Sequence, residues 1–474
     1  MLSAKQPLLA KKAKKVAQVQ SSIPSSVFNM TNMIIGAGVL ALPFAFCAAG
    51  VIPALLICCA VWMASSYSFM LLARCAEATQ RFSYKGVALE TYGPFAATFS
   101  EGAILIYTMG NLIGRQIILG DLLPPLMRVL LGEGSLYAQR GFVLASTTCF
   151  LLLPVSLSPY IDSLKWSSLF GLCCMCYVVC LFIARFTGGL FSSGTVNVDD
   201  VRMAHSSFLS LMAFPLLVVS FTAHYNIMSM YWELKERSIE KMQFVVSSST
   251  GICLAVYIVV GVSGYMLFMD DTQPNILVNF WTDKRRAPDG FVSLAFIAIS
   301  LAVSLSFPLV CHGARNSLKK LCCSNPYMNS EDIESGVVLR YLLPCVGDAD
   351  ENGWLNNFLV TSLIIFISFV VGLYIPDIGV IFAFMGSTVG VCFVYILPGL
   401  FYIKVHQMEE DRRAKGNEIK HMPNGGKLKD KALASAASTA LSASPTGALA
   451  LIFFGVFIGL VGTIATSLHV SGFI

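Results

Sequence analysis

The sequence predicts an all-α protein that crosses a membrane eleven times, as two inverted five-helix repeats followed by one C-terminal helix. Hydrophobic residues make up 56% of the 474 residues and charged residues 12%, with a mean hydropathy of +0.71. A soluble domain averages about 45–50% apolar and about 25% charged residues, so the composition indicates a polytopic membrane protein. The first and the sixth apolar stretches are interrupted at matching places, which is typical of inverted repeats.

Each predicted span is an apolar stretch long enough to cross a bilayer. In chain order the spans are 26–47, 51–73, 94–119, 141–158, 165–185, 206–232, 243–268, 291–313, 355–373, 378–402 and 447–469. We divide the chain into a basic tail, a first repeat, a second repeat, a flexible linker rich in Lys, Ala, Ser and Gly, and an eleventh helix. These parts cover 1–25, 26–186, 206–403, 404–446 and 447–470.

The orientation can be inferred from the Lys and Arg residues in the connections between spans. With the N-terminus in the cytoplasm, and with the end residues Lys165 and Arg185 of the fifth span counted with the connections beside them, the inside connections hold 24 of these residues and the outside loops hold 7, while Arg115 lies within a span. Cytoplasmic loops carry the excess of positive charge in membrane proteins. We therefore expect a cytoplasmic N-terminus and, with an odd number of spans, an extracytoplasmic C-terminus.

The two interrupted spans are the strongest functional signal. The first is cut by Gly36-Ala37-Gly38, and the sixth carries Pro215 and then Ser220-Phe221-Thr222, with His224 and Asn226 close behind. In hydrocarbon every backbone group needs a partner, so an unwound stretch lines a cavity or binds something. Freed N–H groups suit a carboxylate and freed C=O groups suit an ammonium group or Na⁺. We expect a substrate site here, although Gly-x-Gly also permits close helix packing.

Three blocks of sequence resemble the amino acid/auxin permease family, in particular its branch of sodium-coupled neutral amino acid transporters. SSVFNMTNMIIGAGVLALPFAFCAAG at 25–50 resembles the family's first span. FTAHYNIMSMYWELKERS at 221–238 and GYMLFMDDTQPNIL at 264–277 resemble its sixth span and the segment after that span, and IILGDLLP at 117–124 resembles the end of its third. The resemblance implies the leucine-transporter fold, alternating access, and secondary transport of amino acids driven by Na⁺ or H⁺.

The resemblance also implies roles for particular residues. Substrate would be held by Ile35, Gly36, Ala37, Gly38, Val39, Ser220, Phe221 and Thr222. In sodium-coupled relatives one ion lies between the first and eighth spans, which here implies Asn32, the carbonyl of Ile35, Ser300 and Ser304. Hydroxyl and carbonyl oxygens suit a hard cation, but a serine within a span also bonds back to its own helix.

Three ionisable residues within the spans have open roles. Arg115 stands where relatives more often have tyrosine, and intramembrane charge marks a functional position. It could clamp a substrate carboxylate, replace a coupling cation, or extend outward to pair with Asp121. Glu101 is a proton-relay candidate that could instead pair with a neighbouring helix. His224 could titrate near neutral pH or serve as a fixed hydrogen-bonding residue.

The motifs of common enzymes are missing from the sequence. It has no Walker loop, no HExxH and no nucleophile elbow, and little chain lies outside the spans, so we expect no enzymatic activity. We expect no cofactor and no metal beyond a possible Na⁺. An amino-acid-sensing receptor with weak transport and an uncoupled facilitative carrier remain alternatives. We expect a monomer in the bilayer with an amino acid substrate and no nucleic acid partner. The plasma membrane is slightly favoured over a vacuolar or lysosomal membrane.

Overall fold

The predicted all-α class is confirmed. Within the described residues every regular element is a helix, and one isolated β-bridge joins Ser21 to Leu234. The computed structural model describes residues 21–132, 134–157, 165–188, 201–204, 208–282, 289–322, 353–419 and 444–472.

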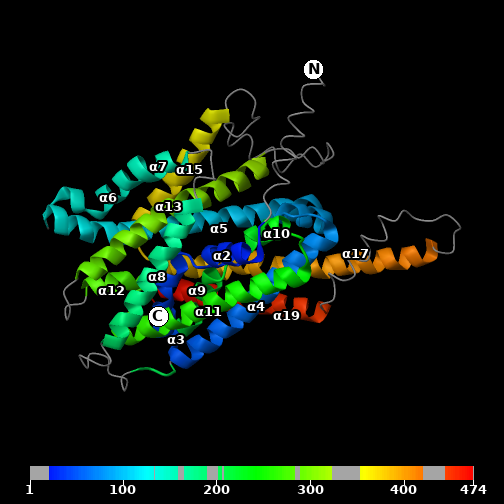
Figure 1. The fold of residues 1–474 in the computed structure, drawn as a ribbon, viewed down its shortest axis with the longest axis horizontal. Helices are drawn as coiled ribbons and strands as arrows, with labels where there is room; N and C mark the ends of the chain where they lie inside the picture. The colour runs from blue at the N-terminus through cyan, green and yellow to red at the C-terminus, as the bar shows by residue number, and fades with distance from the viewer. Residues whose placement is uncertain are drawn as a thin grey trace.

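The helices occur in the chain order of the predicted spans (Figure 1). The first half contains α2 (Ile23–Ile34), η1 (Ala37–Ala41), α3 (Leu42–Ala49), α4 (Val51–Thr79), α5 (Tyr84–Leu131), η2 (Leu136–Ala138), α6 (Arg140–Thr147), η3 (Thr148–Leu152), α7 (Leu153–Ser156) and α8 (Lys165–Gly188).

The second half begins with a short helical turn and ends in a long helix. It contains η7 (Phe208–Met212), α9 (Ala213–Ser220), α10 (His224–Glu233), α11 (Ile239–Phe268), η8 (Met269–Asp271), α12 (Ile276–Thr282), α13 (Gly290–Cys322), α15 (Gly353–Tyr374), α16 (Ile378–Met385), η10 (Gly386–Gly390), η11 (Cys392–Ile396) and α17 (Leu397–Ile419). After the linker, α19 (Pro445–Val470) forms the last helix.

The number of spans is close to the eleven predicted. The described part of the chain has nine helices long and apolar enough to cross a membrane, and the bent pair Ile23–Ile34 and Gly38–Ala49 makes ten. The predicted fourth span, 141–158, corresponds to the shorter apolar helix Arg140–Ser156, which is interrupted by the π-helical turn η3. The count of eleven is therefore not reached by length and composition alone.

Two helices are longer than the sequence suggested. The third span was predicted over 94–119, whereas α5 has 48 residues and bends at Gly93, where φ is 80°. At 1.5 Å per residue the part after the bend, from Pro94 to Leu131, is about 57 Å long, roughly twice the hydrocarbon thickness. The helix α17 continues to Ile419, into the predicted linker 404–446, where Arg412 pairs with Glu409 across one turn. The residues 420–443 of that linker lie outside the described residues.

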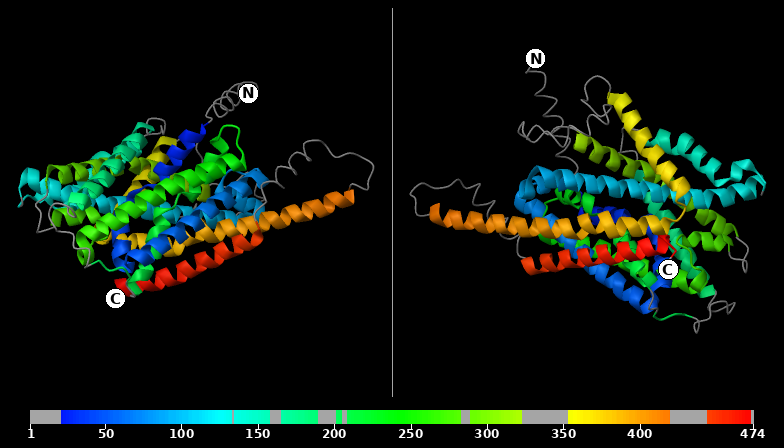
Figure 2. Two further views of the ribbon diagram at one scale, coloured as in Figure 1. Left: turned by 60° about the horizontal axis from the view of Figure 1, so that its bottom comes forward. Right: turned by 180° about the vertical axis from the view of Figure 1, so that it is seen from behind.

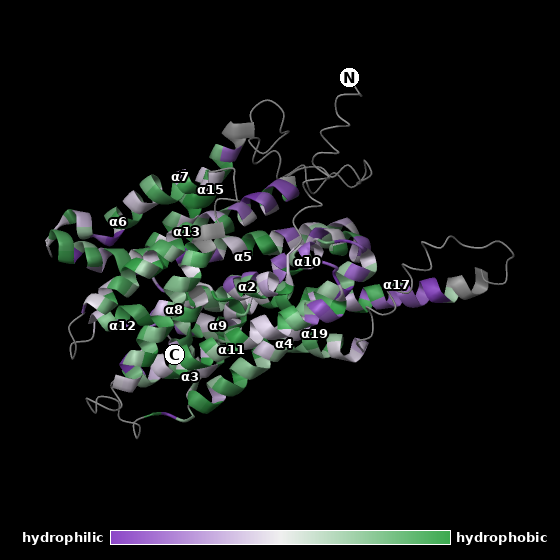
Figure 3. Ribbon diagram, viewed as in Figure 1, coloured by the Kyte–Doolittle hydropathy of each residue, from purple (hydrophilic) through white to green (hydrophobic). Residues whose placement is uncertain are grey.

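The two interrupted spans lie inside the bundle. Figure 1 shows α2 and α9 in the middle, with α5 and α13 on one side and α4 and α11 on the other. Figure 2 shows α19 alongside α17, which projects beyond the other helices, and the two helices are in contact. Figure 3 shows apolar residues through the body of the bundle and polar residues on the projecting part of α17. The functional signal from the sequence therefore falls at the centre of the fold.

Candidate functional site

The first break lies where the sequence predicts it. The helix α2 ends at Ile34, Ile35 leaves the helical conformation at φ −72° and ψ 84°, and Gly36 is extended. The Gly36 N–H donates to the Ile34 carbonyl at 2.8 Å, and η1 then starts in a new direction, so that the two halves of the span differ by 50°. The first N–H groups of η1 have no partner within their own helix.

The second break also lies at the predicted place. The helix α9 ends at Ser220, Phe221 and Thr222 are not helical, and α10 begins at His224. The Thr222 N–H donates to the Val219 carbonyl at 3.2 Å, which closes the end of α9. As in the first span, a fresh helix start therefore presents backbone N–H groups in the middle of the bundle.

The two breaks are packed directly against each other. A Cβ atom on Gly38 would lie 2.9 Å from the Ser220 Oγ and 3.2 Å from the Ser220 Cα, so only glycine fits there. A Cβ on Gly36 would meet nothing closer than the Ile34 carbonyl oxygen at 3.9 Å. Gly38 is thus a packing contact between the breaks, and the open space beside them lies at Gly36.

The predicted side chains of the second break turn toward their own helix. The Ser220 hydroxyl donates to the Leu216 carbonyl at 2.9 Å and the Thr222 hydroxyl to the Val218 carbonyl at 2.6 Å. The Phe221 side chain is fully buried. The backbone at the break is therefore more available to a ligand than these two hydroxyl groups.

One residue that the sequence analysis missed connects the breaks. The hydroxyl group of Tyr257, on α11, lies 2.8 Å from the Ile34 carbonyl oxygen and 2.6 Å from the Ser220 carbonyl oxygen. Tyr257 sits in an ordinary apolar run with no motif around it, so only the three-dimensional contact could reveal it.

No hydrogen bond among the described residues joins the side chains proposed for an ion. Asn32 is partly exposed on α2, while Ser300 and Ser304 are buried on α13. The helix α13 packs most closely on α5 and α8, whereas α2 packs on α11. The Ser300 hydroxyl has no hydrogen-bond partner among the described residues, so it is available to a ligand.

Of the three roles left open for Arg115, the outward pairing with Asp121 is not the one that the structure shows. The Arg115 Nη1 donates to the Ser306 Oγ on α13 at 2.9 Å. Asp121 instead pairs with Arg140 and accepts a hydrogen bond from Asn275. The Asp121 carboxylate, farther along α5 than Arg115, therefore already has Arg140 as its cationic partner. Arg115 is therefore directed between α5 and α13, and it forms no ion pair with any described residue.

Glu101 and His224 are both buried. Glu101 is 1% exposed and pairs with Lys320 at the end of α13 at 3.0 Å, which matches its alternative role as a partner of a neighbouring helix. The second carboxylate oxygen of Glu101 has no hydrogen-bond partner among the described residues. The His224 ring stacks on Phe69, with ring centroids 3.9 Å apart. Packing therefore fixes the position of the imidazole.

A polar cluster ties the helices together at one end of the bundle. Asp121 connects α5 to Arg140 of α6 and Asn275, just before α12. A cavity of about 250 Å³ adjoins this cluster and is lined partly by Trp281 and Phe296. We call this region the Asp121 end.

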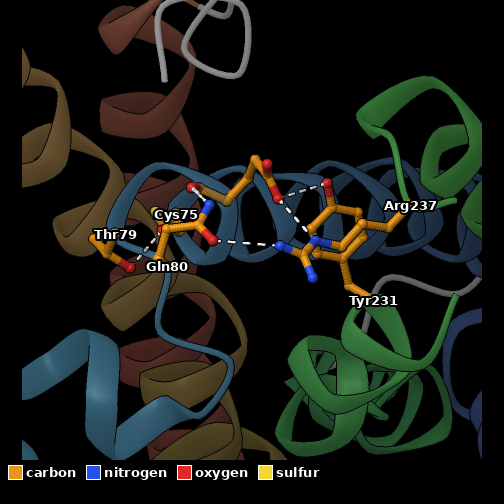
Figure 4. Close-up of polar contacts among 6 residues, drawn as sticks. Cys75, Thr79, Gln80, Tyr231 and Arg237 are labelled. Atoms are coloured by element: carbon orange, nitrogen blue, oxygen red, sulfur yellow. Dashed lines mark hydrogen bonds and ion pairs between the residues drawn. The ribbon is translucent and has the colours of Figure 1, made fainter. Parts of the chain in front are cut away.

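A second cluster lies at the opposite end of α5, near its start. The Glu77 carboxylate, on α4, accepts a hydrogen bond from the Tyr231 hydroxyl at 3.0 Å and another from the Arg237 Nε at 3.4 Å. Figure 4 shows Tyr231 and Arg237 pointing toward Gln80 and the end of α4. Arg237 also donates to Gln80 and lies over the Phe82 ring, 4.6 Å from its centroid. We call this region the Glu77 end.

The segment just before α2 is held at the Glu77 end. The Ser21 N–H donates to the Glu233 carbonyl at 2.7 Å, and the Lys235 N–H donates to the Ser21 carbonyl at 3.0 Å. The connection between α10 and α11 thus binds the beginning of the first span. Both interrupted spans meet at this end as well as at the breaks.

The chain matches the family model described as "Transmembrane amino acid transporter protein" over residues 19–419. It is 27% identical to sodium-coupled neutral amino acid transporter 7 of Xenopus laevis over 401 residues, which cover 83% of each protein. It is 29% identical to amino acid transporter AVT6B of Arabidopsis thaliana over 413 residues, which cover 83% of this chain and 85% of that one.

The fold is similar to that of a solved transporter. The crystal structure of MhsT in complex with L-phenylalanine superposes with a TM-score of 0.54 at 12% identity, covering 93% of this chain and 98% of MhsT. At this identity the likeness concerns the fold alone. It confirms the leucine-transporter fold implied by the sequence.

Proposed function

Because the chain belongs to the transmembrane amino acid transporter family, we propose that the two breaks form the site where an amino acid is bound during transport. Direct contact between Gly38 and Ser220 is the observation that carries this proposal. This contact brings the ends of α2 and α9 and the starts of η1 and α10 into one buried region. The chain is a secondary transporter rather than an enzyme.

The chemistry of the breaks suits a zwitterion. The N–H groups that begin η1 and α10 would hold the carboxylate, at the positive ends of their helices. Carbonyl oxygens near the ends of α2 and α9 would accept from the ammonium group. The backbone from Ile35 to Val39 and that of Ser220, Phe221 and Thr222 supply these groups, and the free space at Gly36 leaves room for the substrate.

Alternating access would open one end of the bundle at a time. The Asp121 end joins α5 and α6 to the segment before α12, and the Glu77 end joins α4 to the connection between α10 and α11. The excess of Lys and Arg in the predicted inside connections supports a cytoplasmic Glu77 end and an outside C-terminus. We slightly favour the plasma membrane over a vacuolar or lysosomal one.

Either Na⁺ or H⁺ would drive transport. The unpartnered hydroxyl of Ser300 supports a Na⁺ site with Asn32, the Ile35 carbonyl and Ser304, and one relative carries "sodium-coupled" in its name. The free carboxylate oxygen of Glu101 supports a proton route instead. His224 is a weaker relay candidate, because its ring is packed against Phe69.

Counterflow in proteoliposomes tests the site. Labelled L-alanine, L-glutamine, L-glutamate and L-arginine are offered to the parent protein and to Gly36→Val, whose side chain would fill the open space. We expect Gly36→Val to lower counterflow of the best-transported amino acid at least tenfold without loss of folded protein. Gly171→Val is the matched control, since a Cβ on Gly171 of α8 has nothing within 4 Å.

Each outcome has a clear meaning. If Gly36→Val transports as well as Gly171→Val, the substrate site is not at the first break. If the parent protein binds an amino acid, seen as thermal stabilisation, but shows no counterflow, the sensing receptor replaces the carrier. Counterflow that ignores both Na⁺ and pH gradients identifies an uncoupled carrier.

A further inference from the structure

Tyr257 belongs to neither interrupted span, yet its hydroxyl contacts both. It lies in the middle of α11, and its side chain is fully buried. Its hydroxyl oxygen is within hydrogen-bond distance of the Ile34 carbonyl at 2.8 Å and the Ser220 carbonyl at 2.6 Å. These carbonyls belong to the last residues of α2 and α9, so they are groups that each break deprives of a helical partner.

The single hydroxyl proton of Tyr257 lies between the ends of α2 and α9. A phenol has a single O–H, which donates fully to one carbonyl or is shared between two. The Ile34 carbonyl also accepts from the Gly36 N–H at 2.8 Å, so it does not depend on Tyr257 for a partner. Satisfying buried polar groups alone therefore requires only the contact with Ser220. The hydroxyl nevertheless lies within hydrogen-bond distance of both carbonyl oxygens, so its proton, when shared, links the ends of α2 and α9.

The tyrosine ring itself is held in place. Phe221, at the second break, packs edge-on against it with ring centroids 4.9 Å apart. On the same face of α11, Gly261 and Gly264 leave room for Phe46 and Pro43 of α3. A Cβ at either glycine would collide with those side chains, so α11 lies close against the second half of the first span. Moving α11, and with it the Tyr257 hydroxyl, away from the two carbonyls would therefore disturb the packing of α11 against α3.

We propose that Tyr257 is a positioning residue of the substrate site: its hydroxyl holds the ends of α2 and α9 together, so that the N–H groups of η1 and α10 converge on one amino acid. This inference rests on the proposed function. Without the hydroxyl, the two half-helix ends separate more freely, and binding must first restore their spacing. The loss should therefore fall on substrate affinity more than on the rate of the transport cycle.

Tyr257→Phe removes one oxygen atom and keeps the ring. In counterflow of the amino acid that the parent carries best among L-alanine, L-glutamine, L-glutamate and L-arginine, we expect KM to rise about tenfold and the maximal rate to change less than twofold. Loss of one buried hydrogen-bonding group has an effect of this order. Hydrogen exchange should also become faster in peptides covering residues 34–42 and 220–228.

Tyr395→Phe is the matched control. Tyr395 is also fully buried, but its hydroxyl lies 3.0 Å from the Ser65 hydroxyl rather than beside the Ile34 and Ser220 carbonyls. We expect parent-like KM and unchanged exchange at the two breaks in this variant.

Three results would overturn the inference. The first is a KM for Tyr257→Phe within twofold of the parent value while Gly36→Val abolishes counterflow. In that case the proposed substrate site at the breaks stands, but Tyr257 does not position it. The second is unchanged exchange at both breaks. The third is failure of Tyr257→Phe, but not of Tyr395→Phe, to give monodisperse protein, which assigns the hydroxyl to folding. If Gly36→Val also transports normally, the proposed site is lost as well.

Discussion

Arg115 is a positively charged residue within a span that has no anionic partner among the described residues. Its guanidinium lies between α5 and α13, and one nitrogen donates to the neutral Ser306 hydroxyl. The Arg115 Nε is buried and has no hydrogen-bond partner among the described residues. A charge that is partly buried and has only neutral partners is costly. We therefore propose that an anionic group of the substrate approaches Arg115, or that this charge takes the place of a coupling cation.

Arg115→Lys tests this proposal at the level of one side chain. Lysine keeps the positive charge but loses the planar fork that contacts a carboxylate through two nitrogens. If Arg115 contacts the substrate, we expect the order of uptake among acidic, neutral and basic amino acids to change, with a KM increase of about tenfold for the preferred one. Uptake of a labelled panel into proteoliposomes measures this.

Asp121→Asn is the control for Arg115→Lys. Asp121 pairs with Arg140 rather than Arg115, so its substitution should leave the order of substrates unchanged. An identical order of uptake in the parent and in Arg115→Lys would remove Arg115 from the substrate site.

At the level of helices, the sequence predicted the breaks better than the lengths. Gly36 and Gly38 predicted the first break only together with the matching interruption of the sixth span, because Gly-x-Gly alone also permits close helix packing. The predicted start of the third span, 94, coincides with the bend at Gly93, whereas its predicted end, 119, is too early because the helix continues through Pro124 and Pro125 to Leu131. In α17 the pairing of Arg412 with Glu409 supports a helix where composition suggested a linker.

Contacts between distant helices could not be predicted from one sequence. Tyr257 lies 223 positions from Ile34 and 37 from Ser220. Glu77 likewise lies 160 positions from Arg237. Neither pair has a local spacing that would signal it. For the same reason, the sequence left open the alternative in which Arg115 pairs with Asp121. It does not show that Asp121 forms its ion pair with Arg140.

At the Glu77 end, a substitution can test whether α4 holds the connection between α10 and α11. Glu77→Gln keeps the side-chain size but removes the charge that holds Arg237. We expect the connection between α10 and α11 to loosen, and with it the backbone pairing of Ser21 with Glu233 and Lys235. Hydrogen exchange of peptides covering Ser21 and Lys235 should become severalfold faster.

Glu236→Gln is the matched control, because Glu236 lies on the same connection but is exposed and pairs with Lys241. Exposed ion pairs contribute little to stability. We expect no change in exchange at Ser21 in this variant. Equal exchange in both variants would mean that Glu77 does not hold the connection.

At the scale of the whole molecule, architecture has been kept where sequence has not. The fold covers 98% of MhsT at 12% identity. At this identity the likeness concerns the arrangement of the helices and not individual side chains. In this chain the two interrupted spans meet at the centre of that arrangement, where Tyr257 contacts both of them. The shared fold does not determine the coupling ion, which needs its own experiment.

Ser300→Ala tests Na⁺ coupling of the whole transport cycle. The Ser300 hydroxyl is buried on α13 without a hydrogen-bond partner among the described residues, so it can turn its oxygen to a cation. If Na⁺ drives uptake, we expect the half-saturating Na⁺ concentration to rise roughly threefold to tenfold, the effect of losing one such ligand. Ser263→Ala is the control, because the Ser263 hydroxyl already donates to the Val259 carbonyl at 2.6 Å. Uptake is measured in proteoliposomes with Na⁺ and pH gradients imposed separately. If uptake by the parent depends on the pH gradient and ignores Na⁺, the sodium site is wrong, and Glu101, with its free carboxylate oxygen, becomes the residue to replace next.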